Sequence, residues 1–372
     1  MLQEADVLAL QATVAWAAFG LSFVLGAVMN RSGFCTMGAL SDILNMGDWT
    51  RMRMWLCAIG VAVLGAQALA LAGLVDLGKS IYTAPRLSWL SNLAGGFLFG
   101  FGMVLASGCG SKTLVRIGGG SLKAVVVFLV LGLTAYMTLR GLFGVWRASF
   151  LDPVAIQLST AQDLPTLLGA GDANTVRTLR LVLGGGIGLA LVAFALAGRE
   201  FRSLDNLLGG IGVGLVVAGA WYVSGHLGFV AEDPRTLEEA FVATNSGRLE
   251  AISFVAPVAY TLELLMFWSD ASRIVTIGIA SVVGVIAGSF AWALASRSFR
   301  WEGFAGPEDT ANHLVGGALM GIGGVIALGC TIGQGLSGLS TLAIGSFIAF
   351  AAILAGGVAG VRYQAWRVER MV

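Results

Sequence analysis

The sequence has few charged residues, and this scarcity narrows the class of protein. Asp, Glu, Lys and Arg make up 12% of the 372 residues, against roughly 25% in soluble domains. Lysine occurs three times, histidine twice and proline six times, and the net charge of +1 comes without a basic block. These figures exclude a soluble globular enzyme and a disordered chain. Nucleic acid is not an expected partner.

Cysteine is also scarce. The four cysteines are scattered, with no C-x-x-C pair and no metal-ligand spacing, which argues against a disulfide framework and a zinc site. The chain contains no P-loop, no haem-attachment motif and no H-E-x-x-H motif. We therefore expect no cofactor, no bound metal, no ATP hydrolysis within the chain and no enzymatic activity.

The sequence is instead rich in long apolar runs and in glycine. Hydrophobic residues make up 57% of the chain, its mean hydropathy is +0.85, and 54 residues are glycine. A helix crosses the hydrocarbon core with about 20 apolar residues. The sequence therefore predicts an all-α polytopic membrane protein with about nine transmembrane helices. The candidate spans are 7–28, 54–75, 122–143, 179–198, 252–268, 274–296 and 343–361, with glycine-rich segments at 92–108, 206–222 and 312–329.

The charges next to these spans indicate an orientation. Glu4 and Asp6, rather than basic residues, precede the first apolar run, so we interpret it as a retained helix and not a signal peptide. Arginines follow the last span, which by the positive-inside rule predicts a cytoplasmic C-terminus. The polar stretches 145–178 and 229–250 are expected at a membrane surface. We expect a multi-pass protein of a bacterial inner membrane.

A repeat is visible in the glycines. The segment that begins at Gly95 and ends at Cys109 has the same pattern as the segment from Gly316 to Cys330, displaced by 221 residues. Five glycines and one cysteine coincide without a gap. Because cysteine is rare in this chain, chance is a poor explanation, and the pattern predicts an internal duplication.

Two weaker copies extend the repeat. Gly26 precedes Cys35 by nine residues, as Gly100 precedes Cys109. A further copy, displaced by 114 residues from the segment at 92–100, puts Val223 where the cysteine would stand. We therefore predict four related units in two membrane repeats, 1–200 and 201–372. We expect the two repeats to be inverted, because inverted repeats are common in transporters.

The physical role of these units follows from their composition. Small residues let helices approach closely in lipid, and glycine next to each cysteine favours a break in the helix. Non-helical backbone at membrane depth persists only where it is buried in protein or lines a polar path. Broken helices in repeated halves are typical of a midplane binding site, and their N-termini favour an anion.

The candidate site consists of the repeated cysteines and their neighbours. Cys57 lies outside the repeat and is expected only to pack. Nearby cations could draw an anion toward the thiols, and His226 occupies the odd fourth unit. The predicted site residues are Arg31, Gly33, Cys35, Gly108, Cys109, Gly110, Ser111, Lys112, Arg116, His226, Gly329, Cys330, Thr331 and Gln334.

Three motifs carry a resemblance to a known family. Asn30-Arg-Ser-Gly-Phe-Cys35-Thr-Met-Gly-Ala, Gly108-Cys109-Gly-Ser-Lys112 and Gly329-Cys330-Thr-Ile-Gly-Gln334-Gly resemble the cysteine motifs of the YeeE/YedE sulfur-transport membrane proteins. The resemblance covers about residues 15–360. It implies thiosulfate import, an hourglass-like helical fold with four loops that reach the centre, and essential cysteines at these three positions. Some relatives work with a small TusA-like sulfur-carrier protein, and others occur in selenium metabolism.

The resemblance and the residues together suggest a mechanism. A thiol is a weak, neutral S–H donor, and burial beside a dianion keeps it protonated. We hypothesise that thiosulfate, or a related sulfur anion, passes along the three thiols in an order that the sequence does not assign. A persulfide on Cys109, handed to a carrier protein, would instead need a lowered thiol pKa. A soft-metal carrier and a membrane enzyme or assembly subunit are two competing classes of function.

Overall fold

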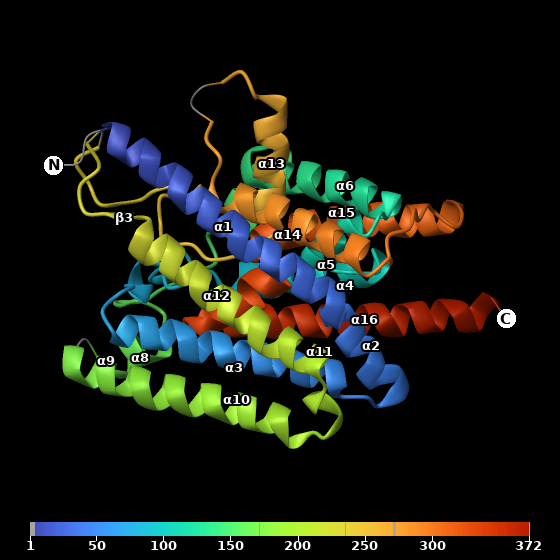
Figure 1. Cartoon of the computed structure of the whole chain (residues 1–372), viewed down its shortest axis with the longest axis horizontal. Coiled ribbons are helices and arrows are strands. Elements are labelled where there is room, and N and C mark those ends of the chain that lie inside the picture. Colours follow the sequence, from blue (N-terminus) through green and yellow to red (C-terminus); the bar gives the residue numbers. More distant parts are fainter. Residues whose placement is uncertain (1–3, 171, 235, 271–272, 372) are drawn as a thin grey trace.

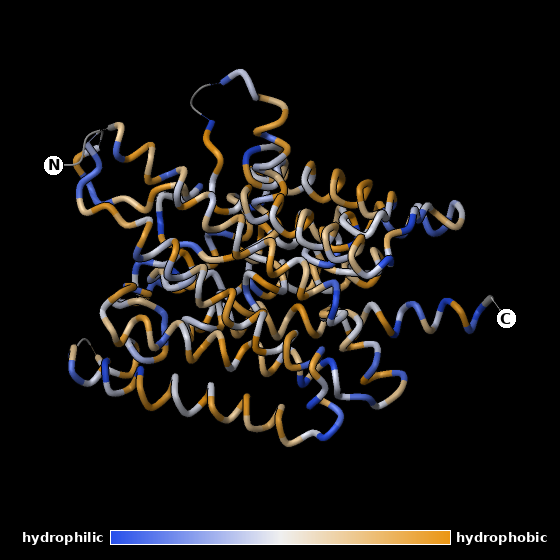
Figure 2. The backbone as a smooth tube through the Cα atoms, in the orientation of Figure 1, coloured by the Kyte–Doolittle hydropathy of each residue, from blue (hydrophilic) through white to orange (hydrophobic). Residues whose placement is uncertain are grey.

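The computed structural model describes the whole chain except residues 1–3, 171, 235, 271–272 and 372. It is an all-helical bundle, and the N- and C-termini lie at opposite ends of its long axis (Figure 1). Hydrophobic residues predominate in the middle of the long helices, and hydrophilic residues gather at the two ends of the molecule and in the loops (Figure 2). This distribution is the one expected of a chain that spans a bilayer.

The helices account for the predicted fold class. Eight helical segments in the described part of the chain are long and apolar enough to cross a membrane, which confirms a polytopic membrane protein. The main helices are α1 (Glu4–Ser32), α2 (Thr36–Met46), α3 (Thr50–Leu71), α4 (Trp89–Leu105), α5 (Gly110–Gly118), α6 (Leu122–Arg140), α10 (Gly185–Ala197), α12 (Val213–Tyr222), α13 (Ala256–Met266), α14 (Ile277–Ala295), α15 (Pro307–Ile326) and α16 (Ile344–Met371).

Short elements join or extend these helices. They are the α-helices α7 (Leu142–Trp146), α8 (Leu164–Leu168), α9 (Ala173–Leu179) and α11 (Leu204–Leu207), the 3-10 turns η1 (Leu77–Lys79) and η4 (Glu200–Arg202), and the π-helical turns η2 (Arg147–Leu151), η3 (Arg180–Gly184), η5 (Leu208–Gly212), η6 (Val223–Leu227) and η7 (Gly333–Gly338). Two small antiparallel pairs join β1 (Arg86–Leu87) to β2 (Ile156–Gln157) and β3 (Phe229–Val230) to β4 (Ala240–Phe241).

Two of the predicted membrane segments are not among the eight candidate spans: 312–329, which lies in α15, and 252–268. Residues 252–268 contain α13, a helix of 11 residues, which at 1.5 Å per residue is roughly 17 Å long and too short to cross the bilayer. Pro257 stands in its first turn, and α13 runs across the long helices (Figure 1). Glu263 on α13 is buried and ion-paired with Arg273 at 2.7 Å. The acidic residue inside this apolar run thus has a structural partner.

Glycine places the helices in contact. A Cβ added to Gly95 of α4 would stand 2.7 Å from the Gly323 oxygen of α15, and one added to Gly102 would stand 2.8 Å from the Gly316 oxygen. The two helices therefore cross antiparallel with their backbones touching. Because Gly95 and Gly102 occupy the positions that correspond to Gly316 and Gly323, the crossing has approximate two-fold symmetry.

A second set of contacts follows the same symmetry. Gly96 of α4 faces Ala349 of α16, and Gly317 of α15 faces Val127 and Val130 of α6. Each glycine-rich helix therefore packs one face on its symmetry mate and another on a long apolar helix that follows a cysteine unit. The thiol-bearing loops lie where these helices meet, which places them inside the bundle.

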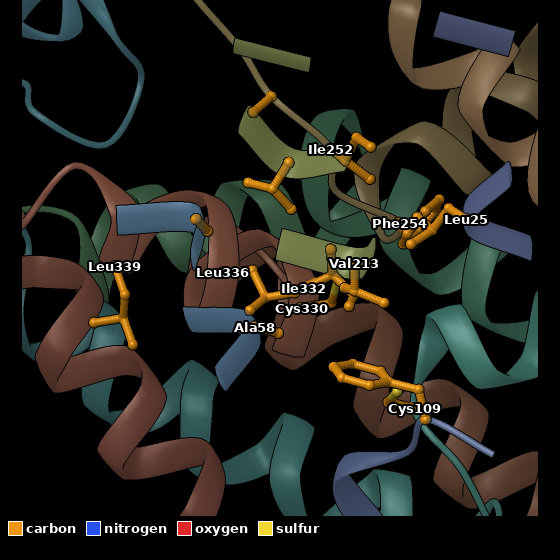
Figure 3. Close-up of a cluster of buried hydrophobic side chains, with 14 of the residues drawn as sticks. Leu25, Ala58, Cys109, Val213, Ile252, Phe254, Cys330, Ile332, Leu336 and Leu339 are labelled. Atoms are coloured by element: carbon orange, nitrogen blue, oxygen red, sulfur yellow. The ribbon is translucent and has the colours of Figure 1, made fainter. Parts of the chain in front are cut away.

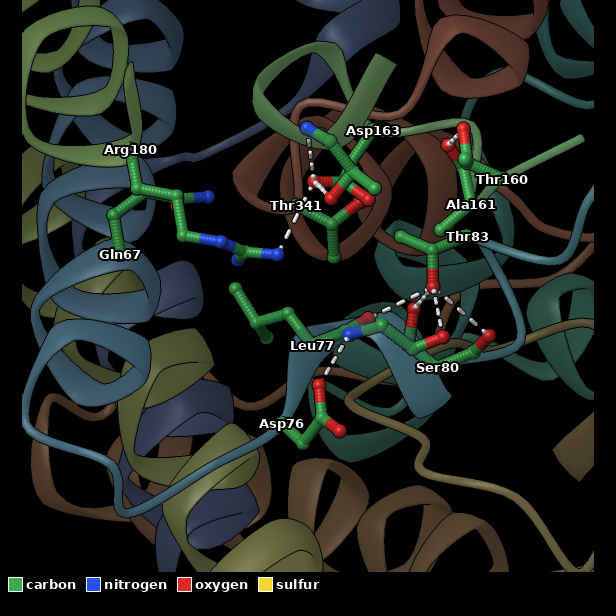
Figure 4. A network of polar contacts seen from close by, with 12 residues as sticks. Gln67, Asp76, Leu77, Ser80, Thr83, Thr160, Ala161, Asp163, Arg180 and Thr341 are labelled. Carbon is green, nitrogen blue, oxygen red and sulfur yellow. Dashed lines mark hydrogen bonds and ion pairs between the residues drawn. The ribbon is translucent and has the colours of Figure 1, made fainter. Parts of the chain in front are cut away.

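A polar cluster stabilises the end of the molecule that carries α8 and α9 (Figure 4). Asp163 is fully buried, caps α8 through the Thr166 N–H and pairs with Arg180 at 3.2 Å. Thr83 donates to the Leu77 oxygen at 2.8 Å. Since a buried charge needs a partner, this pair fixes the polar stretch 145–178 against the membrane helices.

Candidate functional site

All three repeated cysteines lie at helix breaks and are buried. Cys35 follows α1 and is the N-cap of α2, and Cys109 is the N-cap of α5. Cys330 follows α15 and precedes a helical turn that continues into η7. Their exposed fractions are 7%, 1% and 0%. Cys109 and Cys330 lie in a cluster of buried apolar side chains (Figure 3).

The same backbone conformation occurs at each break. The residue two positions before each cysteine has a left-handed conformation: Gly33 has φ 65°, Ser107 φ 56° and Leu328 φ 58°. Left-handed backbone is costly for residues other than glycine, so Ser107 and Leu328 hold a strained conformation at matching places. Strain of this kind persists only where the surrounding structure enforces it.

The fourth unit lacks the break. At Val223 the helix continues from α12 into the π-helical turn η6. Trp221 and Tyr222 stand where the cysteine units have a left-handed residue and its successor, and both keep helical backbone. The four central loops implied by the family resemblance are therefore three broken helices and one bulged helix.

The thiols occupy the free ends of their helices. The Cys35 Sγ accepts the Gly38 N–H at 3.4 Å, and the Cys330 Sγ accepts the Gly333 N–H at 3.4 Å. The Cys109 Sγ lies 3.2 Å from the Ser111 Oγ. Because the backbone N–H bonds to a sulfur lone pair in the first two cases, the S–H remains available as a donor.

Cys109 is a neighbour of both other thiols. Cys35 and Cys330 each lie near it, and Lys112 also lies near Cys35. The structure therefore brings the three cysteines of the sequence prediction into one cluster. Cys57, by contrast, packs against Gly210 between α3 and η5.

Several buried donors, of which the sequence analysis singled out Thr331 alone, lie near the cluster. Thr36 and Thr331, which follow Cys35 and Cys330 directly, have buried hydroxyls without a hydrogen-bond partner among the described residues. The same holds for the Tyr82 hydroxyl and the Trp55 indole N–H. Buried polar groups normally form hydrogen bonds. A set of donors without partners beside three thiols is therefore consistent with a binding site for an anion. Only the predicted Thr331 had a sequence signal, because it lies within a cysteine motif.

The predicted cations and amides have different surroundings. Arg31 pairs with Asp205 at 2.7 Å and lies over the Trp292 ring. Arg116 pairs with Glu302 at 3.3 Å. No acidic side chain in the described part of the chain forms an ion pair with Lys112. The Gln334 amide donates to the Ala327 oxygen at 2.5 Å, which bridges the Cys330 break.

The remaining predicted residues divide into two groups. Gly108, Gly110 and Gly329 lie in the breaks; a Cβ on Gly329 would stand 3.2 Å from Gln334, and one on Gly110 would be 3.6 Å from the Phe254 oxygen. His226 is exposed and stacks on Tyr222. The structure does not bring His226 to the thiols.

A cavity lies on each side of the cluster. One, of about 140 Å³, is lined by Lys112, Arg116, Arg300 and Glu302; we call it the Lys112 cavity. The other, of about 160 Å³, is lined by Arg147, Glu250, Tyr260, Ser253, Leu328 and Gly329; we call it the Glu250 cavity. The connection between α14 and α15 borders the first at the C-terminal end of the molecule, and the segment after β4 borders the second toward the other end (Figure 1).

The Lys112 cavity has a basic electrostatic character. Lys123 binds Glu302 at 2.8 Å. This hydrogen bond, together with the nearby Arg116 charge, lowers the pKa of Glu302 to about 2. The carboxylate is thus held ionised by cations that outnumber it, and Lys112 adds a further positive charge at the end nearest Cys109.

Buried polar breaks inside a bundle of membrane helices, with a cavity on each side, define a membrane transporter of the broken-helix class. The family model for sulphur transport matches residues 31–359. The chain therefore belongs to the sulphur transport family, which is a family of transporters and not of enzymes.

Two curated relatives are similar over most of their length. The chain is 28% identical over 316 residues to the thiosulfate transporter TsuA of Escherichia coli (strain K12), which covers 84% of each chain. It is 29% identical over 335 residues to the thiosulfate transporter TsuA of Spirochaeta thermophila (strain ATCC 700085 / DSM 6578 / Z-1203), which covers 90% of this chain and 94% of that relative.

Proposed function

We propose that this protein imports thiosulfate, or a closely related sulfur anion, across a bacterial inner membrane. The observation that supports the proposal most strongly is the cluster of three buried thiols at helix breaks between two cavities. The names of the two curated relatives give the substrate, since both are thiosulfate transporters.

We further propose that the anion passes along Cys35, Cys109 and Cys330 without covalent bonds to them. Each S–H is a weak donor, and weak sites in series let an ion enter and leave again. The free hydroxyls of Thr36, Thr331 and Tyr82 supplement the thiols. Because all of these donors are neutral, they would not trap a dianion at the centre as a buried cation would.

Two repeats, 1–200 and 201–372, form the framework of this path. The antiparallel crossing of α4 and α15 and the matching strained residues Ser107 and Leu328 support an inverted arrangement. An inverted repeat presents similar breaks to the two sides of the membrane, which suits alternating access.

The arginines support an orientation of the protein in the membrane. Arg51 and Arg53 begin α3, Arg297 and Arg300 connect α14 to α15, and further arginines end α16, all at the end of the molecule marked C in Figure 1. By the positive-inside rule, this distribution supports a cytoplasmic location for this end. The Lys112 cavity would then be the exit and the Glu250 cavity the entrance.

A cytoplasmic partner is the last part of the proposal. The end of α16 extends beyond the bundle and exposes Trp366 and Tyr363 next to three arginines (Figure 1). A small TusA-like sulfur-carrier protein would bind there, and its thiolate would take the outer sulfur of the imported thiosulfate as a persulfide and release sulfite. Loss of copurification after Arg367→Ala and Arg370→Ala would locate the contact.

Uptake of radiolabelled thiosulfate into proteoliposomes tests the function itself. We expect saturable uptake that unlabelled thiosulfate competes away and sulfate competes away far less, because sulfate lacks a soft terminal sulfur. Uptake no faster than in protein-free vesicles would refute the proposal. Saturable uptake of a metal ion instead would favour the soft-metal carrier.

A further inference from the structure

The Glu250 cavity contains a carboxyl group that the thiol path does not use. Glu250 lies in the segment after β4, outside the membrane-spanning helices. One of its carboxylate oxygens accepts the Ser246 N–H at 2.9 Å, and its own N–H donates to the Ser224 Oγ at 3.3 Å. These bonds hold the side chain at the wall of the cavity.

The same cavity reaches the Cys330 break. Leu328 and Gly329, the two residues before Cys330, line it together with Glu250. Tyr82 lies near both Cys330 and Glu250, and its phenol is buried. A Cβ on Gly333, whose N–H bonds to the Cys330 sulfur, would stand 3.4 Å from the Tyr82 hydroxyl.

Two of the cations near Glu250 form ion pairs with other carboxylates, and Arg248 lines a separate cavity with Lys79 and Glu239. Arg147 lines the cavity and pairs with Asp152 at 3.2 Å. Arg140 approaches Glu263 at 3.8 Å. The phenols of Tyr260 and Tyr82 are the further ionisable groups near the carboxylate. Within the described part of the chain, a negative charge on Glu250 would therefore meet an incoming dianion without a neutralising ion pair.

An ionised carboxylate and a dianion repel each other in a partly enclosed cavity, and protonation of the carboxylate removes that repulsion. Burial raises the pKa of Glu250, opposed by the hydrogen bonds from Ser246 and Asn245. The site thus favours the neutral acid more than an exposed glutamate does.

We propose that Glu250 is the proton-coupling group of the transporter: it takes up a proton on the side of the Glu250 cavity when the anion enters, and it releases the proton as the anion leaves. Atoms and charges balance, since the proton binds and leaves one carboxylate oxygen. Each turnover then carries at least one proton with each dianion. The net negative charge that enters is smaller, so the membrane potential opposes import less than it would oppose entry of the dianion alone. This inference rests on the proposed function.

The test measures protons and thiosulfate in the same vesicles. Proteoliposomes contain the pH-sensitive dye pyranine, the membrane potential is clamped with potassium and valinomycin, and radiolabelled thiosulfate is added outside. We expect thiosulfate to acidify the lumen, with a ratio of at least one proton per anion. A more acidic external medium should increase the initial uptake rate several-fold.

Glu250→Gln should lower the ratio of protons to thiosulfate to less than a tenth and remove the response to external pH. The matched control is Glu239→Gln, a carboxyl near the same end of the molecule that pairs with Lys79; both readouts should stay within twofold of the unchanged protein. Size-exclusion chromatography and thermal unfolding check that each variant is folded.

Three results would overturn the inference: thiosulfate uptake without proton entry in the unchanged protein, an unchanged ratio in Glu250→Gln, or a folded Glu250→Gln that no longer exchanges thiosulfate at all. The last would make Glu250 an anion-binding group instead. Failure of the proposed function gives a different result, because the unchanged protein would then take up no thiosulfate under any pH condition.

Discussion

The Cys109 and Cys330 loops share a backbone but differ in their side chains. Both follow a glycine-rich helix, and both have a strained left-handed residue two positions before the thiol. At the next matching positions, however, Ser111 corresponds to Ile332 and Lys112 to Gly333. One loop therefore leads to a basic cavity, and the other to a cavity with a carboxyl group.

This difference shows how a symmetric framework acquires a direction. The glycine contacts and the helix breaks build two equivalent halves of a path, which by themselves would treat both sides of the membrane alike. In the proposed mechanism, the unmatched Lys112 attracts an anion at one end, whereas Glu250 takes up a proton as the anion enters at the other. Four predictions test the symmetric framework first and then the asymmetric chemistry.

The largest effect should come from the crossing of α4 and α15. Gly95→Ala and Gly316→Ala would each press a Cβ against backbone atoms within 2.5–2.7 Å, at an expected cost of about 1–3 kcal/mol. Because the crossing is two-fold symmetric, the two variants should lower the unfolding temperature in detergent by similar amounts. Gly20→Ala, where nothing lies within 4 Å, is the control, and a strong loss of stability there would undermine the packing argument.

The next effect concerns the unmatched cation. Lys112→Gln should raise the thiosulfate concentration for half-maximal uptake by about fivefold, which is near 1 kcal/mol of lost attraction. High salt should shrink the difference, since it screens the charge. Lys79→Gln at the other end of the molecule is the matched control. Equal effects of the two variants would contradict a specific role for Lys112 in attracting the anion.

An effect of similar size is expected at Tyr82. Its buried hydroxyl has no hydrogen-bond partner among the residues that the structure describes, so Tyr82→Phe removes an unsatisfied group and should leave the unfolding temperature unchanged or slightly raised. If the hydroxyl donates to the passing anion, uptake should fall by about fivefold, the equivalent of one hydrogen bond. A purely structural role would give the opposite pair of results, lower stability with normal uptake.

The smallest effect depends on pH. The folded-state pKa of Glu302 is about 2, below the usual value of 4.5, so its ion pairs stabilise the protein above pH 4.5 and lose that contribution as the pH falls toward 2. Glu302→Gln should therefore lower the unfolding temperature slightly at pH 6 and hardly at all near pH 2.5. Glu369→Gln, at the exposed end of α16, should show no such dependence, and a pH-independent loss in Glu302→Gln would contradict the assignment.

Much of this account could be predicted from the sequence. The apolar runs predict the membrane helices, and the displacement of 221 residues identifies Gly95, Gly102, Gly316 and Gly323, which meet in one crossing. A rare cysteine in a repeated position pointed to each helix break. These features are local or periodic, so the sequence expresses them directly.

Other features depend on contacts between distant segments. The repeat suggested a break at Val223, but Trp221 and Tyr222 keep helical backbone and the helix continues through this position. Asp205 lies 174 residues from its partner Arg31, and Tyr82 and Glu250 approach Cys330 from separate loops. No periodicity in the chain marks such neighbours, and the short α13 shows that hydropathy alone does not establish a membrane crossing.

The proposed function depends on three buried thiols that carry the anion. Its most direct test is the initial rate of labelled thiosulfate uptake into proteoliposomes with Cys35→Ala, Cys109→Ala, Cys330→Ala and, as the matched control, Cys57→Ala. We expect each of the first three folded variants to fall to a tenth of the normal rate or less, while Cys57→Ala stays within twofold. Normal uptake in all three would contradict it.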